Sequence, residues 1–476
     1  MAVLAETRDL SSASGARERL EQFLSTQRAK RHPSENFEQF ERELHSYFAA
    51  AECEVLGEEL GRWDVDLPTL EIDGQSYRRV LRSETTYLSA AGPVRVERNL
   101  YGRGLAGEPA LCPLELRAGI VEGYWTPRAA RQGIWTVAQM TPGDAEKHFV
   151  ELENMQPSRS SLDRLPKALN CRWEANRERF EAELRSQWEV PAGAVTVAVS
   201  LDGVMVPMRD GDRHKKRVQS VAAGKATRGP AGYQEVGCGT LSFYDAQGER
   251  LSTLRMARMP EPKKTTLKAM LTAELEAVRE QCPPLQVVKL ADGAKDNWTY
   301  LSETLPGGTE LVDFYHAAAH LKVAFDQVYG ASNPTAAAQF AKYRHVLRDD
   351  EDGVEKVIRT LAYHHKKHPR RQKLLTELKY FRGHRHRMRY AHAAAQKLPI
   401  GSGVVEAACK TLATQRLKGA GMRWRHSGGQ AILTWRALGH SDRFVQGWNL
   451  VAQTYKRQVS IPENVVIFPT RTQSVK

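Results

Sequence analysis

Between residues 195 and 292 the hydrophobic pattern changes between strand-like and helical periodicity. The order of these stretches limits the fold more than any other feature of the chain does. Runs of β-branched and apolar residues at 195–201, 235–244 and 250–256 predict three strands. The amphipathic stretch 264–280 then predicts a helix, and a fourth apolar run follows at 285–291. Three strands, a helix and a further strand predict an α/β domain built on a mixed sheet.

This order matches the opening of an RNase H-like core, in which the first and fourth strands lie side by side. Asp202 follows the first run and Asp292 closes the fourth, so we expect the two aspartates to be neighbours. A third carboxylate, Glu406, lies where a glycine-rich loop opens into a helix. An aspartate at a strand end often only caps the next helix, so the assignment depends on all three carboxylates together.

Two aspartates at strand ends and a glutamate on a helix can converge on two divalent metals about 3.5–4 Å apart. We expect Asp202 to bridge both metals, because a rigid strand fixes its position, and Asp292 and Glu406 to hold one metal each. Ligands with oxygen donors alone favour Mg²⁺, and Mn²⁺ should substitute. Such a centre activates the attacking oxygen and neutralises the leaving oxygen in phosphodiester chemistry.

The net charge is +13, which indicates a polyanionic partner. No stretch approaches the roughly 18–20 apolar residues that span a bilayer. The N-terminal residues include an acidic side chain where a signal peptide would have an apolar segment. These features predict a cytoplasmic protein that acts on nucleic acid. The six cysteines are scattered singly, which indicates neither a zinc site nor a disulfide framework.

Seven regions are expected along the chain. They are a helical N-terminal region (1–60), a small antiparallel β region (61–106) and a helical region (107–192). The first part of the core (193–309), a basic helical insertion (310–398), the second part of the core with the Glu-bearing helix (399–455) and a C-terminal tail (456–476) follow. The last residues, 470–476, are expected to fray.

The region 107–192 contains a candidate helix-turn-helix for DNA ends. A helix is expected at 141–152 and a second at 158–169, capped by Ser158. Arg159 and Ser161 would then lie near base edges or phosphates. A helical hairpin with a short polar turn is an equal alternative, and Pro166 could begin a separate helix.

Five motifs occur in order along the chain: Leu-Asp-Gly at 201–203, Asp-Gly-Ala at 292–294, Asp-Phe-Tyr-His at 313–316, Gly-Ser-Gly-Val-Val-Glu at 401–406, and a basic segment with Gly-Met-x-Trp ending at 424. With these motifs the chain resembles the DDE transposases of bacterial insertion sequences, most closely the ISKra-type group, over roughly residues 85–450. Related groups often carry a cysteine-rich, zinc-binding N-terminal segment, which this chain lacks.

The resemblance implies metal-dependent cleavage at the ends of an insertion sequence and strand transfer to target DNA. It also implies double-stranded DNA as the partner, a homo-oligomer on that DNA, and binding to the bacterial nucleoid. Two alternatives stay open: a structure-specific nuclease without strand transfer, and a DNA-binding protein whose catalytic core has decayed.

Several residues are expected to support the site. Asp313 and His316 match an Asp-x-x-His element of the family; His316 would orient a scissile phosphate or a flipped base, or it would only bond Asp313 at a helix start. Lys410 would contact phosphate, or pair with Glu406 four residues earlier. Arg416 and Lys418 are further candidates for DNA contact.

The segment 364–389 is dense in lysine, arginine and histidine. We expect it to follow the phosphate backbone, with Arg370 and Arg371 as contacts. Its five histidines could instead form a metal-binding tract, but they have no carboxylate or cysteine company. A solvated surface is the remaining alternative.

Overall fold

The computed structural model describes residues 15–30, 32, 36–105, 107–153, 155–209, 211–227, 232–305 and 307–460. The chain divides into two compact units, the first of Met1–Arg172 with Trp448–Lys476 and the second of Trp173–Gly447. No helix among the described residues is long and apolar enough to cross a membrane. All six cysteines are described, and all are free thiols.

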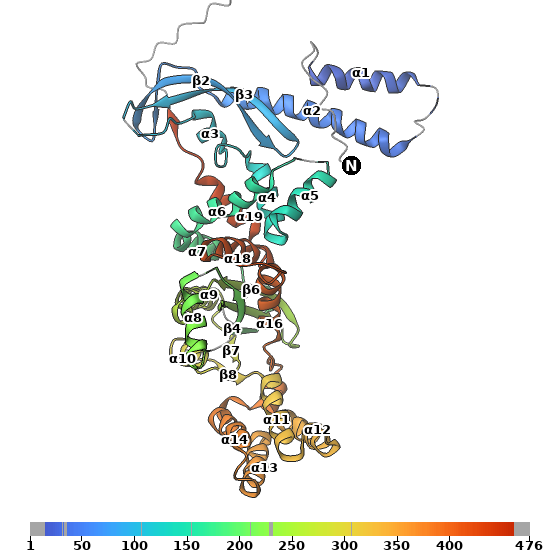
Figure 1. Ribbon diagram of the computed structural model, residues 1–476, viewed down its shortest axis with the longest axis vertical. Coiled ribbons are helices and arrows are strands. Elements are labelled where there is room, and N and C mark those ends of the chain that lie inside the picture. Colours follow the sequence, from blue (N-terminus) through green and yellow to red (C-terminus); the bar gives the residue numbers. More distant parts are fainter. Residues whose placement is uncertain are drawn as a thin grey trace, which may run out of the picture. The chain divides into compact units, whose positions relative to one another are not determined.

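The first unit combines helices with an antiparallel sheet in the order β3-β2-β1-β9 (Figure 1). Its elements, with the two helices that run past its borders, are α1 Ala16–Ala29, α2 Phe37–Trp63, β1 Thr69–Ile72, β2 Gln75–Ser89, β3 Gly92–Gly102, α3 Pro113–Ala118, α4 Pro127–Gln139, α5 Pro142–Glu151, α6 Arg159–Ala175, α19 Phe444–Gln453 and β9 Val459–Ser460. The predicted sheet of hairpins is confirmed. Asp73 and Gly74 both have positive φ, as the tight turn between β1 and β2 requires.

The expected C-terminal tail 456–476 begins with residues that join the sheet of the first unit. Val459 and Ser460 pair antiparallel with β1, which would otherwise be an edge strand with unpaired backbone groups. Arg457 reinforces this pairing through an ion pair with Asp73, with 2.7 Å between Nε and Oδ2. The fraying expected at 470–476 falls outside the described residues.

The helices expected around 141–169 are present as α5 and α6. The Ser161 amide donates to the Ser158 hydroxyl at 3.2 Å, so the predicted N-terminal cap is confirmed. Pro166 does not begin a new helix, because α6 continues through it. Buried Leu162, Leu165 and Leu169 anchor the same helix on both sides of the proline.

The second unit is built on a mixed sheet in the order β6-β5-β4-β7-β8 (Figure 1). Its first elements are α7 Arg177–Ser186, β4 Thr196–Pro207, α8 Gly211–Ala222, β5 Tyr233–Tyr244, β6 Arg250–Arg258, α9 Thr265–Gln281, β7 Gln286–Ala291, α10 Lys295–Glu303 and β8 Thr309–Val312. Strand β4 is antiparallel to β5 and parallel to β7, so the first and fourth predicted strands are neighbours.

Strand β4 is longer than predicted. It continues to Pro207 because its pairing with β5 persists over its whole length, so Asp202 lies inside the strand and not at its end. The pairing with β7, in contrast, stops at Ser200 and Leu290. Asp202 therefore lies just beyond the point where the two parallel strands part.

The two faces of the sheet have different neighbours. Helix α9 covers one face, where Leu267 and Leu271 pack close to Gly237 and Gly239 of β5. The opposite face of β4 carries Asp202, whose carboxylate meets Cys409 of the helical segment after the insertion. Alternation along β4 thus places Val197, Val199 and Leu201 on the face that α9 covers and Asp202 on the other face.

Along the sequence, the helical insertion begins after β8 and ends before the segment that carries Cys409. Its helices are α11 Phe314–Tyr329, α12 Pro334–Asp349, α13 Gly353–Lys367, α14 Gln372–His384 and α15 Tyr390–Ala395 (Figure 1). The chain then returns through α16 Gly403–Ala408, the π-helical segment η3 Cys409–Thr414, α17 Gln415–Leu417 and α18 His426–His440. The predicted helical character of this part is confirmed.

Candidate active site

Asp202 lies inside β4, and Asp292 is the first residue after the parallel neighbouring strand β7. The β4–β7 ladder runs from Thr196 opposite Gln286 to Ser200 opposite Leu290, and each aspartate lies two positions further on. Burial is the main cause that raises the pKa of Asp202, and the nearby charge of Asp292 raises it further.

Asn297 of α10 joins the two strand ends. Its amide nitrogen lies 3.2 Å from Asp292 Oδ1 and 3.4 Å from the Leu201 carbonyl oxygen. The Ala294 amide also donates to Asp292 Oδ1, at 3.1 Å. These bonds orient the Asp292 carboxylate while its backbone leaves the strand.

The segment that carries Glu406 packs beside Asp202. The thiol of Cys409, three residues after Glu406, donates to Asp202 Oδ2 with 3.7 Å between sulfur and oxygen. The hydrogen bond with the neighbouring Cys238 is the main cause that raises the pKa of Cys409, and burial and Asp202 raise it further, so it stays a thiol. The Glu406 carboxylate itself is half-exposed and accepts a hydrogen bond from the Ser402 hydroxyl at 3.3 Å.

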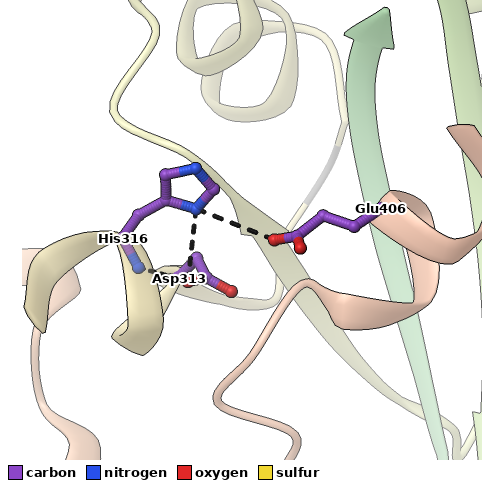
Figure 2. Close-up of side chains that lie close together, drawn as sticks. All are labelled: Asp313, His316 and Glu406. Carbon is purple, nitrogen blue, oxygen red and sulfur yellow. Dashed lines mark hydrogen bonds and ion pairs between the residues drawn. The ribbon is translucent and has the colours of Figure 1, made fainter. Parts of the chain in front are cut away.

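His316 lies between two carboxylates (Figure 2). Its Nδ1 is 3.3 Å from Asp313 Oδ1 and 3.9 Å from Glu406 Oε1. Asp313 is fully buried and caps α11 by accepting from the His316 amide at 2.6 Å, and it also accepts from the Ser402 amide. The helix-start interaction expected for Asp313 and His316 is thus present, and it binds the start of α11 to the loop before Glu406.

The charges around His316 favour its cationic form. The hydrogen bond with Asp313 is the main cause that raises the pKa of His316 to about 9, against the opposing effect of burial. Asp292 and Glu406 raise it further. Burial raises the pKa of Asp313, but hydrogen bonds from His316 and Ser402 outweigh it and leave that pKa below its ordinary value.

The ligand atoms of Asp313, His316 and Glu406 lie within 4.8 Å of one another and could hold a metal ion. Asp202 and Asp292 are outside this group, although Asp292 acts electrostatically on both Asp202 and His316. The oxygen donors fit a hard divalent cation, because a cation would offset the desolvation and mutual repulsion of the carboxylates.

The basic candidates fall into two kinds. Lys410 and Lys418 are exposed, and no ion pair joins Lys410 to Glu406 in the part of the chain that the structure describes. Arg416 is buried at 4% exposure and stacks over the Trp424 ring at 5.3 Å. Arg416 therefore contributes to packing, and its contact with DNA stays a prediction.

Arg370 and Arg371 are both exposed between α13 and α14 but differ in role. The Arg371 guanidinium donates to the Gln327 carbonyl and, at 2.9 Å, to the Val328 carbonyl. These carbonyls belong to the last turn of α11, so Arg371 caps that helix. Arg370 remains the better candidate for a phosphate contact.

In the first unit, Arg159 and Ser161 lie in the first turn of α6. The Arg159 side chain is exposed, while its amide donates to Glu146 Oε1 of α5 at 2.8 Å. Ser161 is half-buried, and its hydroxyl lies 3.0 Å from that of Ser158. Arg159 is therefore available to a partner, and Ser161 mainly completes the cap.

Sequence reasoning missed other groups near the carboxylates. Lys264, at the start of α9, has a positive φ of 55°, pairs with Glu235 at 3.0 Å and lowers the pKa of Asp202. Glu235 in turn overlies Gly203, where a Cβ would collide with its carboxylate. The glycine of the Leu-Asp-Gly motif was the only sequence signal for this close approach.

No protein-family model matches the chain, and no curated protein matches it. Among solved structures, the chain is similar to the Drosophila P element transposase strand transfer complex, with 12% identity and a TM-score of 0.23. That match covers 69% of this chain and 83% of the other. At this level the likeness does not decide the function, which rests on the geometry of the site.

Proposed function

We propose that the protein is a metal-dependent DNA transposase with an RNase H-like core, like the ISKra-type enzymes that its motifs resemble. The observation that carries this proposal is the placement of Asp202 in β4 and of Asp292 directly after the parallel neighbour β7, with the Glu406 segment packed beside Asp202. The strand order supports it, because β4 and β7 are neighbours although α8, β5, β6 and α9 separate them in sequence.

In the proposed reaction a water oxygen attacks the phosphorus at the end of the element. The bond from phosphorus to the 3′ oxygen breaks and leaves a free 3′-hydroxyl. In the second step this 3′ oxygen bonds to a phosphorus of target DNA while the bond from that phosphorus to the target's own 3′ oxygen breaks, and the proton of the attacking hydroxyl passes to the displaced target 3′ oxygen. Two Mg²⁺ ions bound by Asp202, Asp292 and Glu406 would supply activation of the attacking oxygen and charge neutralisation at the leaving oxygen. Mn²⁺ would substitute.

The chain's own groups have distinct tasks in this reaction. The β4 backbone holds Asp202 in a fixed place, while Asn297 and Ala294 hold Asp292. With the metals on Asp202, Asp292 and Glu406, His316 would not be a ligand, and its pKa, raised to about 9 mainly by its hydrogen bond with Asp313, would let it attract the scissile phosphate as a cation. The net charge of +13 favours binding of the DNA backbone.

The test is an assay on a labelled duplex made from the DNA that flanks the gene, with a supercoiled plasmid as the target. We expect cleavage in Mg²⁺ or Mn²⁺, none in EDTA, and joined products with the plasmid. Cleavage without joined products would indicate a structure-specific nuclease, and binding without cleavage a decayed enzyme. Cleavage that persists in EDTA would contradict the proposal.

A further inference from the structure

A second group of side chains borders the carboxylates and has no role in the reaction above. His320 lies one turn after His316 on α11, and its Nδ1 is 2.6 Å from Glu377 Oε2 of α14. Glu377 is buried at 5% exposure. A buried carboxylate that bonds one ring nitrogen fixes the orientation of the imidazole.

The fixed imidazole in turn holds Tyr380. The rings of His320 and Tyr380 stack with 3.7 Å between centroids and 21° between planes. On its other side Tyr380 approaches His384, with 5.0 Å between ring centroids. A side chain held by a stack and by its own helix loses little further freedom when it binds a ligand.

Tyr380 lies directly against the loop that follows Asp292. A Cβ added at Gly293 would lie 2.5 Å from Tyr380 Cε2, closer than real Cβ contacts. Only glycine therefore allows this approach, which accounts for the glycine of the Asp-Gly-Ala motif. Burial is the main cause that raises the pKa of Tyr380, and the negative charges of Asp292 and Asp313 raise it further.

The Tyr380 hydroxyl is a buried donor without a partner. Its oxygen is shielded from solvent and makes no hydrogen bond to any of the described residues. A buried polar group of this kind costs free energy unless it is satisfied, and its pKa is raised, so it remains a protonated donor at neutral pH. The Tyr380 ring packs against the residue after Asp292, and in the proposed reaction a substrate phosphate would lie beside Asp292.

We propose that the Tyr380 hydroxyl binds the substrate, donating a hydrogen bond to a non-bridging oxygen of the phosphodiester held beside Asp292. His320 and Glu377 are positioning residues that keep the phenol in place. This inference rests on the proposed function in one respect, because it takes the ligand to be a DNA phosphate. It assigns to the insertion helix α14 a contact that the carboxylates alone do not provide.

The test substitutes Tyr380→Phe and measures affinity for a labelled duplex in Mg²⁺, in an Asp202→Asn background so that the duplex stays intact. A hydrogen bond to a charged phosphate predicts roughly tenfold or more weaker binding. The melting temperature should stay equal or rise, because the change removes an unsatisfied buried hydroxyl. The matched control is Tyr343→Phe on α12, whose hydroxyl accepts from Thr360 at 2.9 Å; it should lose stability and keep its affinity.

The outcomes separate this inference from the proposed function. Unchanged affinity in Tyr380→Phe overturns the inference, even if the wild-type protein cleaves DNA. A joint loss of affinity and melting temperature would make Tyr380 structural and also overturn it. If the wild-type protein never cleaves but Tyr380→Phe binds DNA about tenfold more weakly, the proposed function fails while the phosphate contact stands.

Discussion

Asp202 and Asp292 each lie two positions beyond the last pair of the β4–β7 ladder, so parallel pairing brings two residues far apart in sequence close together. The carboxylates are close enough for Asp292 to raise the pKa of Asp202, in addition to the larger effect of burial. In the absence of a cation this arrangement costs free energy. Because of this cost, replacing Asp202 should not lower the unfolding free energy of the metal-free protein.

Replacing Asp202 with Asn should abolish cleavage without loss of folding. The loss of several kcal/mol of charge stabilisation corresponds to a rate lower by roughly a thousandfold, at about 1.4 kcal/mol per factor of ten. The unfolding free energy without metal should rise or stay equal, because a buried charge and its repulsion with Asp292 are removed. Gel assays of cleavage and thermal melting check both effects, and near-normal cleavage by the variant would remove Asp202 from the site.

Glu406→Gln should weaken the response to metal. Divalent cations that bind the folded protein raise its melting temperature, and the rise depends on affinity. We expect Mn²⁺ to raise the melting temperature of the wild-type protein and to raise that of Glu406→Gln less. Glu280→Gln, an exposed change on α9, is the control. An equal rise in all three proteins would exclude Glu406 as a ligand.

Arg370→Ala and Arg371→Ala should have separable effects. Arg370→Ala should weaken binding about equally for all DNA sequences and lower the slope of log affinity against log salt by about one. Arg371→Ala should instead lower the unfolding free energy by about 1–2 kcal/mol, because it removes bonds to the last carbonyls of α11. A sequence-dependent loss in Arg370→Ala would show that this segment contacts bases.

Arg159→Ala should reduce the preference for element ends over random duplex, since the exposed Arg159 lies in the first turn of a capped helix. The competition assay uses the whole protein, and Arg164→Ala on the same helix is the control. If the two variants discriminate equally well, end recognition lies outside the first turn of α6.

Folding stability should depend on pH through Glu181 of α7, which is 9% exposed. Burial is the main cause that raises the pKa of Glu181 from 4.5 to about 7. Because the folded pKa is the higher one, its contribution to stability is fully present below pH 4.5 and is lost as the pH rises through about 7. The loss is on the order of 3 kcal/mol.

The measurement is the difference in unfolding free energy between the wild-type protein and Glu181→Gln from pH 4 to pH 8, about the range around this window. As the pH rises, the unfolding free energy of the wild-type protein should fall relative to that of Glu181→Gln. Glu183→Gln, at an exposed position on the same helix, is the control. A difference that does not vary with pH would contradict the raised pKa.

Local patterns in the sequence were sufficient for much of this protein. β-branched and apolar runs predicted the strands, the amphipathic pattern of 264–280 predicted α9, and Ser158 was predicted to cap the helix that begins after it. The three carboxylates could be chosen because each stands next to such an element. These features depend on interactions within a few residues, which a sequence records directly.

Only the tertiary structure decided which side chains meet. Arg416 and Lys418 look alike in sequence, yet one is buried against Trp424 and the other is exposed. Tyr380 comes to Gly293 only because α14 folds back over the strand ends. Pairing with β5 extended β4 past Asp202. Contacts between distant segments depend on packing of whole elements, and packing of that kind leaves no periodic signal in the chain.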